Sequence, residues 1–166
     1  RVVVLTGAGQ SFCAGLDLQD AASAQGIEGG GFELGASFDV QTAPPNILHR
    51  MDTPTICALN GSAAGYGMDL ALCCDIRIAG ASSRFGVPIA RLGFPMAPAE
   101  LQIVAAVFGT TALRELLIEA RVLDARAAWE RGLVTRIVPD DHVAAEARLA
   151  AERMALLSPQ ALRLNK

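Results

Sequence analysis

The sequence has 166 residues, of which 52% are hydrophobic and 19% charged. This length and apolar content are typical of one globular domain with a sizeable core, and they exclude an intrinsically disordered chain. Fourteen basic residues against 17 acidic ones leave a formal net charge of −3, which offers no basic surface for nucleic acid. Apolar runs such as 103–108 are too short to span a bilayer, so we expect no membrane partner.

The cysteines and histidines argue against a metal or redox site. No pair of the four cysteines has C-x-x-C spacing, and the adjacent Cys73 and Cys74 are badly placed to bridge each other. Each cysteine lies in an apolar run, which is typical of small buried side chains in a reducing cytosol. His49 and His142 have charged neighbours and form no histidine-based metal site. We therefore expect no bound metal and a cytoplasmic location.

In the first half of the chain, apolar runs alternate with glycine-rich turns. Residues 2–5 are β-branched and apolar, and they predict a central strand covered on both faces. Residues 20–45, rich in Gly, Ala and Ser, predict a long loop. The run 55–59 predicts a second buried strand, which the Asn60-Gly61 turn ends. The next expected elements are a short helix over 46–51, a helix over 68–74 opened by Gly65-Tyr66-Gly67, and a strand over 75–79 with Asp75 and Arg77 on one face.

The second half is predicted to be mainly helical. Asp124 is placed to cap a helix over 125–131 that Gly132 ends. Ser158-Pro159 is placed to begin a final helix. The other expected elements are helices over 98–108, from Thr110 or Thr111 to about 120 and from Asp140 or Asp141 to about 157, and a strand over 133–138. Early strands followed by helices predict an α/β fold.

Two glycine-containing turns after buried strands carry the functional signal. The first, at 12–18, reads Phe-Cys-Ala-Gly-Leu-Asp-Leu, and the second, at 60–70, reads Asn-Gly-Ser-Ala-Ala-Gly-Tyr-Gly-Met-Asp-Leu. Glycines there are compatible with tight strand-to-helix connections and nothing more. Alternatively, both turns present backbone N–H groups to one point, and the second lies at a helix N-terminus, where the dipole favours negative charge. Neither turn has the sequence of a phosphate-binding loop.

By their order and spacing, these turns and several other segments resemble the crotonase (enoyl-CoA hydratase/isomerase) superfamily over nearly the whole chain. The resemblance implies a ClpP/crotonase-type fold of stacked strand–strand–helix units, with an acyl-CoA-binding core at 1–110 and a helical part at 111–166 for trimerisation and active-site cover. Family members are usually longer at both ends, so we expect this chain to be an internal part of a longer domain. The further segments that carry the resemblance are 1–9, 74–79, 85–88, 92–93 and 131–134.

The resemblance implies chemistry on an acyl-CoA thioester, with no cofactor beyond the CoA moiety of the substrate. Family members hold the thioester carbonyl oxygen with two backbone N–H groups, which here fall at Leu16 and Tyr66. A homotrimer or hexamer and a role in fatty acid metabolism are also implied. The residues implied to contact the CoA ester are Ala14, Leu16, Asp17, Leu18, Gln19 and Tyr66.

The acid–base residues depart from the family pattern. Hydratases of the family position and ionise a water with two glutamates, which fall here at Asp69 and at Ile89, and isoleucine cannot move a proton. Glu100 is the nearest substitute in the sequence. Asp69 is alternatively a buried structural carboxylate, and Glu100 one that a helix dipole favours. We predict isomerase-like or other single-carboxylate enolate chemistry, with Asp69 or Glu100 as the proton shuttle.

Two other functions stay open at this point. Clp-type serine peptidases share the fold family, but their nucleophilic serine falls at Gly65, and Ser62 stands three residues earlier on the wrong side of the turn. The stronger alternative is a non-catalytic acyl-CoA-binding protein, because Ile89 removes a catalytic group while both backbone donors are kept. Turnover of crotonyl-CoA or of a 3-enoyl-CoA discriminates an enzyme from a binder.

Overall fold

The computed structural model describes residues 1–15, 17, 43–93, 95–96 and 98–166. The strands in this part of the chain are β1 (Val3–Thr6), β2 (Thr55–Leu59), β3 (Ala63–Ala64), β4 (Ile76–Gly80), β5 (Arg84–Gly86), β6 (Leu123–Asp124) and β7 (Arg136–Val138). The α-helices are α2 (Pro44–Arg50), α3 (Tyr66–Leu72), α4 (Pro98–Phe108), α5 (Thr110–Leu117), α6 (Ala125–Glu130), α7 (Val143–Ala155) and α8 (Pro159–Asn165). Two short 3-10 helices are η1 (Pro88–Leu92) and η2 (Asp140–His142).

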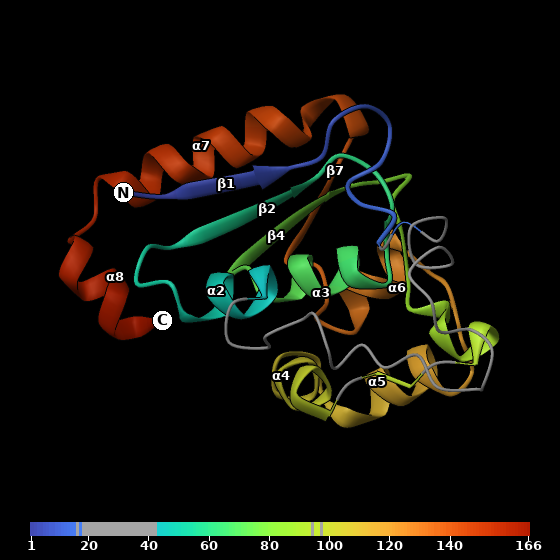
Figure 1. The fold of residues 1–166 in the computed structure, drawn as a ribbon. Helices are drawn as coiled ribbons and strands as arrows, with labels where there is room; N and C mark the ends of the chain where they lie inside the picture. Colours follow the sequence, from blue (N-terminus) through green and yellow to red (C-terminus); the bar gives the residue numbers. More distant parts are fainter. Residues whose placement is uncertain (16, 18–42, 94, 97) are drawn as a thin grey trace.

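A four-stranded parallel sheet in the order β1-β2-β4-β7 organises the molecule (Figure 1). Helix α7 covers one face of this sheet, and α2 and α3 lie on the other (Figure 1). A smaller sheet, β3-β5-β6, forms beyond the carboxyl end of β2. The described residues contain no helix with the length and apolar character needed to cross a bilayer. This α/β arrangement, with helices dominating after β5, agrees with the fold class that the sequence predicts.

Strand β2 lies at the centre of the core, as the sequence predicts. All five of its residues are buried, and it pairs in parallel with β1 on one side and β4 on the other. Because successive strand residues point to opposite faces, Ile56 and Ala58 pack with α7, whereas Cys57 and Leu59 join the larger cluster that includes α3. The alternation along one strand thus links the two halves of the core.

Strand β1 is less enclosed than the sequence predicts. Among the described residues it stands at the end of the sheet order, and Val4 is 41% exposed. An uninterrupted β-branched run indicates an apolar strand, but it does not indicate whether that strand has a neighbour on one side or on both sides in the sheet. The prediction of a central strand is therefore wrong for this part of the chain, and its faces are only partly covered, by α7 on one side and by the cluster that Leu5 joins on the other.

Two of the predicted helix caps are wrong and two are confirmed. Helix α5 follows Gly109, which has no side chain to cap it. Asp140 lies in η2, and its carboxylate accepts the N–H of Ser82 at 3.0 Å instead of capping α7. Asp124, in contrast, accepts the N–H of Ala127 at 2.8 Å, and Ser158 accepts the N–H of Ala161 at 3.3 Å. Asp140 does not cap α7 because its carboxylate accepts a backbone N–H from the loop after β4, 58 residues earlier in the chain.

Arg77 of β4 is buried and fixes the C-terminal end of α3. Its guanidinium donates to the carbonyl oxygens of Leu72, Cys74 and Leu133, and the residue is 7% exposed. Burial lowers the pKa of Arg77 from its ordinary value, and the group stays a cation because that value is so high. A positive charge at the negative end of a helix dipole is favourable, so Arg77 holds α3 in place against the sheet.

Candidate active site

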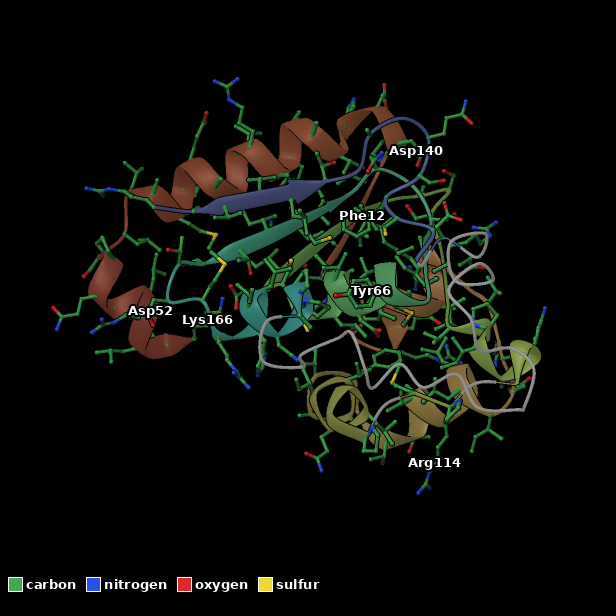
Figure 2. The ribbon with its side chains drawn as sticks, in the orientation of Figure 1. Phe12, Asp52, Tyr66, Arg114, Asp140 and Lys166 are labelled. Atoms are coloured by element: carbon green, nitrogen blue, oxygen red, sulfur yellow. The ribbon has the colours of Figure 1, made fainter. Side chains whose placement is uncertain are left out.

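The turn that follows β1 and the turn that follows β2 run side by side. The N–H groups of Phe12 and Cys13 donate to the carbonyl of Ser62 at 3.0 and 3.3 Å, and the N–H of Ala64 donates to the carbonyl of Cys13 at 2.9 Å. Cys13 and Ala63 form a parallel bridge. Phe12 and Tyr66, labelled in Figure 2, mark the two turns. The described parts of the two glycine-containing turns therefore meet, as the sequence predicts.

Glycine is required where the two turns come closest. A Cβ on Gly67 would lie 2.4 Å from the carbonyl oxygen of Cys13. A Cβ on Gly15, whose φ is +94°, would lie 2.8 Å from the carbonyl oxygen of Ala64 and 3.4 Å from the backbone nitrogen of Tyr66. Any larger residue at either position would push the turns apart. The backbone of Gly15 thus lies next to the first residue of α3.

Tyr66 begins α3 because Gly65 turns the chain sharply there. Gly65 has φ 51° and ψ −123°, a conformation that residues with a Cβ rarely adopt. Its N–H donates to the carbonyl of Gly86 at 2.9 Å, which fixes the turn to the end of β5. The Tyr66 side chain is half-buried. The N-terminal end of α3, where a helix dipole favours negative charge, therefore lies next to Gly15.

Asp69 is the acidic residue in the first turn of α3. It is only 5% exposed, and its N–H donates to the carbonyl of Gly65 at 3.3 Å. Its helix neighbours Met68 and Leu72 are buried in the main core cluster. A carboxylate is thus held in a largely apolar setting, within one helical turn of Tyr66.

Ile89 lies in η1, directly after β5, and packs against the main core cluster. β5 pairs with β3, which precedes Gly65 and Tyr66, so η1 emerges near the N-terminal end of α3. The position that matches the second family glutamate is therefore filled by an apolar, half-buried side chain. It offers neither an acceptor nor a proton for a water molecule.

The remaining predicted site residues divide into two groups. Ala14 belongs to the turn beside α3, and Asp17 is exposed. Leu16, Leu18 and Gln19 lie outside the described residues. The backbone of Glu100 belongs to the first turn of α4, and α4 packs against α3, but the Glu100 side chain is outside the described part of the structure.

The sequence indicates that Asn60 is a turn residue, but it does not reveal the hydrogen bonds that the Asn60 side chain makes to another loop. Its Oδ1 accepts the N–H of Gly7 at 2.9 Å and the hydroxyl of Thr6 at 3.3 Å. Its Nδ2 donates to the carbonyl oxygens of Gly9 and Ser11 at 3.0 and 3.4 Å. Asparagine often bonds backbone groups in turns, but the sequence does not show that the turn it holds belongs to the neighbouring strand.

The described residues contain no group of three or more His, Cys, Asp or Glu side chains arranged to hold a metal ion. A groove of about 430 Å³ opens between β1 and α7, lined in part by Val2, Val4, Ala144 and Ala151. This groove is on the α7 face of the sheet, whereas Tyr66 and Asp69 belong to the helix on the opposite face (Figure 1).

The comparison with known protein families identifies the family to which the chain belongs. Residues 1–166 match the family model described as enoyl-CoA hydratase/isomerase. The chain belongs to the enoyl-CoA hydratase/isomerase family. The crotonase resemblance carried by the two turns is thereby confirmed.

Two relatives of this chain have hydratase names. A Thermus thermophilus protein provisionally named an enoyl-CoA hydratase is 37% identical over 100% of this chain and 64% of its own length. A crotonyl-CoA hydratase of Syntrophomonas wolfei is 32% identical over 100% of this chain and 62% of its own length. The chain therefore spans less than two thirds of these two relatives.

Solved structures of the enoyl-CoA hydratase/isomerase family have the same fold. An enoyl-CoA hydratase/carnithine racemase from Magnetospirillum magneticum is 35% identical with a TM-score of 0.88, and the match covers 99% of this chain and 61% of that one. A monofunctional enoyl-CoA isomerase from M. smegmatis is 31% identical with a TM-score of 0.72, covering 99% and 68%. These matches confirm the crotonase-type α/β fold.

Proposed function

We propose that this protein is an acyl-CoA enzyme of the enoyl-CoA hydratase/isomerase type that stabilises a thioester enolate with backbone N–H groups from two turns. The observation that carries the proposal is the approach of Gly15 to the backbone nitrogen of Tyr66, 3.4 Å from where a Gly15 Cβ would stand. Family membership and relatives named for enoyl-CoA chemistry support it.

The thioester carbonyl oxygen binds between the two turns, where the N–H groups of Leu16 and Tyr66 donate to it. Negative charge develops on this oxygen when the α-carbon loses a proton, and the N-terminal end of α3 favours that charge. One such donor contributes about 3 kcal/mol to lowering a barrier in other oxyanion holes. The CoA moiety extends along the first turn, past Ala14, Asp17, Leu18 and Gln19, and the enzyme uses no other cofactor.

Asp69 is the first candidate for the proton shuttle, because it is buried in the first turn of α3. With a 3-enoyl-CoA substrate, its carboxylate accepts a proton from the α-carbon, and the electron pair of that C–H bond spreads to the carbonyl oxygen as a dienolate. The proton then returns to the γ-carbon, which leaves a 2-enoyl thioester. Glu100 is the second candidate for the same role.

Ile89 favours isomerisation over hydration. Addition of water by the usual route of the family needs a second carboxylate to orient and ionise the water, and isoleucine supplies none. Proton transfer between two carbons of the substrate needs one carboxylate only. The test is to compare turnover of a 3-enoyl-CoA with hydration of crotonyl-CoA under the same conditions. Isomerisation faster than hydration supports the proposal, and hydration faster than isomerisation contradicts it.

A non-catalytic acyl-CoA-binding protein is the second candidate, and the observation that favours it is again Ile89. Binding of acyl-CoA without turnover of either substrate would decide for the binder. For either function we propose a homotrimer or hexamer, with the late helices in the subunit interface, in a cytoplasmic setting. Sedimentation of the purified protein tests the oligomeric state.

A further inference from the structure

We propose that Asn60 is a positioning residue for the thioester carbonyl site, and that its side chain sets the separation between the turn ending at Gly15 and the first turn of α3. The inference rests on the proposed function, because the separation matters only if both turns hold one oxygen atom. Asn60 would touch neither the substrate nor the reacting atoms. It would act through the backbone of the loop after β1.

The amide of Asn60 holds this loop at three backbone groups. Oδ1 accepts from the N–H of Gly7 at 2.9 Å, whereas the Thr6 hydroxyl, 3.3 Å from Oδ1, has a nearer acceptor in the carbonyl of Ala58 at 3.0 Å. Nδ2 donates to the carbonyl oxygens of Gly9 and Ser11, at 3.0 and 3.4 Å. One side chain at the end of β2 thus bonds the backbone at both ends and in the middle of the stretch 7–11, which leads into the turn at 12–15.

The loop and the end of β2 are also packed as closely as backbones allow. A Cβ on Gly61 would lie 2.1 Å from the carbonyl oxygen of Gln10, and a Cβ on Gly7 would lie 2.4 Å from the carbonyl oxygen of Phe12. These contacts stop the loop from moving inward. The Asn60 hydrogen bonds oppose outward movement of the stretch that leads into the turn, and the bonds of Phe12 and Cys13 to Ser62 hold the turn itself.

The core of the fold does not depend on these hydrogen bonds. Asn60 follows the last residue of β2 and is only half-buried. The β1–β2 pairing from Val3 to Thr6 and the packing of Ile56, Cys57 and Leu59 are made by other groups. Removing the amide should therefore leave the fold in place and shift the loop. A misplacement of about 1 Å in a catalytic arrangement can lower a rate about 100-fold.

The experiment measures polarisation of a bound thioester directly. Butyryl-CoA with a ¹³C-labelled thioester carbon is bound to the protein, and isotope-edited infrared spectroscopy records the shift of its carbonyl stretch to lower frequency. Saturated butyryl-CoA is used because it cannot be isomerised or hydrated. In Asn60→Ala we expect at least about half of the wild-type shift to be lost and kcat for a 3-enoyl-CoA to fall about 10- to 100-fold. The dissociation constant of butyryl-CoA should change by less than about threefold.

Two further variants separate positioning from general loss of stability. Asn60→Asp keeps the oxygen acceptor for Gly7 but places a carboxylate oxygen, in place of the donor, against the carbonyl oxygens of Gly9 and Ser11, so we expect a clearly reduced carbonyl shift there as well. Ser158→Ala is the control, because the Ser158 hydroxyl accepts the N–H of Ala161 at 3.3 Å at the start of α8, away from the two turns. It should keep the full wild-type shift.

A wild-type carbonyl shift and kcat in folded Asn60→Ala would overturn the role of Asn60 while leaving the proposed function intact. If Asn60→Ala does not fold, Asn60→Asp decides in the same way, since a full shift there overturns the role as well. Wild-type protein that binds butyryl-CoA with no shift contradicts the proposed function and, with it, the role of Asn60.

Discussion

In the proposed mechanism, Asp69 is the residue on which the proton transfer depends most directly. It is buried in the first turn of α3, and Asp69→Asn keeps its size while removing the proton acceptor. We predict that turnover of a 3-enoyl-CoA falls about tenfold or more with acyl-CoA affinity little changed, measured by steady-state kinetics and binding titration. Glu100→Gln is the matched comparison. Unchanged turnover in Asp69→Asn removes Asp69 from the mechanism and transfers the role to Glu100.

Ile89 is the residue that separates isomerisation from hydration in this account. Ile89→Glu introduces a carboxylate where hydratases of the family have one, and Ile89→Gln introduces a side chain of the same shape that cannot take a proton. We predict that hydration of crotonyl-CoA rises about tenfold or more in Ile89→Glu and not in Ile89→Gln. Equal hydration rates in the two variants would show that Ile89 does not limit water addition.

Asp140 connects the loop after β4 to η2, and its stabilising effect depends on pH. The hydrogen bonds from Ser82 lower the pKa of Asp140. Because the folded pKa lies below the unfolded one of about 4, the carboxylate stabilises the fold above about pH 4, and this contribution is lost as pH falls through the folded pKa. The folded state thus gains stability from this group only while the group is ionised.

The test compares Asp140→Asn with wild type, because asparagine keeps an acceptor for Ser82 and removes only the charge. We predict that the variant has the lower free energy of unfolding near about pH 7, and that the two proteins converge in acid below about pH 4. Urea unfolding at several pH values measures this. A difference that stays constant with pH would contradict the assignment.

At the scale of elements, the position of α3 is set at both ends. Its N-terminus is fixed by the hydrogen bond from Gly65 to Gly86, and its C-terminus by the guanidinium of Arg77 on the carbonyls of Leu72 and Cys74. These contacts tie the helix to β5 and β4, one in each sheet. The helix that carries Tyr66 and Asp69 is therefore held rigidly between the two sheets.

Removing the Arg77 side chain should loosen α3. In Arg77→Met, three buried carbonyl oxygens lose their donor, and each such loss costs on the order of 1 kcal/mol or more. We predict that Arg77→Met lowers the free energy of unfolding by about 3 kcal/mol, measured by urea denaturation. Arg77→Lys keeps the charge but reaches fewer carbonyls, so its free energy of unfolding should lie between those of Arg77→Met and the wild-type protein. A change below about 1 kcal/mol in Arg77→Met would contradict this role.

The elements that the sequence predicts well are those specified by local chemistry. The apolar run of β2, the proline and glycine that bound α4 and the Asp124 cap all act within a few residues. The wrong predictions concern residues and strands whose structure depends on a partner far away in the sequence. Asp140 bonds a loop 58 residues away, and β1 has fewer described neighbours than its composition suggests. Likewise, the sequence predicts that the two turns meet, but it does not predict that the Asn60 side chain bonds the loop that leads into the first turn.

At the scale of the whole molecule, the sheet separates two faces with different contents. The α7 face is filled mainly by alanine and valine from α7 against β2 and β4. The other face has α2 and α3, and Lys166 reaches it from α8 by pairing with Asp75 at 3.0 Å (Figure 2). The same ammonium donates to the carbonyls of Leu48 and Thr53. The end of the chain is thereby tied to the layer that carries the candidate site.

Deuterium exchange at the α-carbon tests most directly whether this molecule forms a thioester enolate. A 3-enoyl-CoA is incubated with the protein in D₂O, and mass spectrometry follows uptake of deuterium by both recovered substrate and product. We predict uptake catalysed by the wild-type protein, and uptake slower by about tenfold or more in Asp69→Asn. Wild-type protein that binds the thioester and catalyses no α-carbon exchange would contradict it.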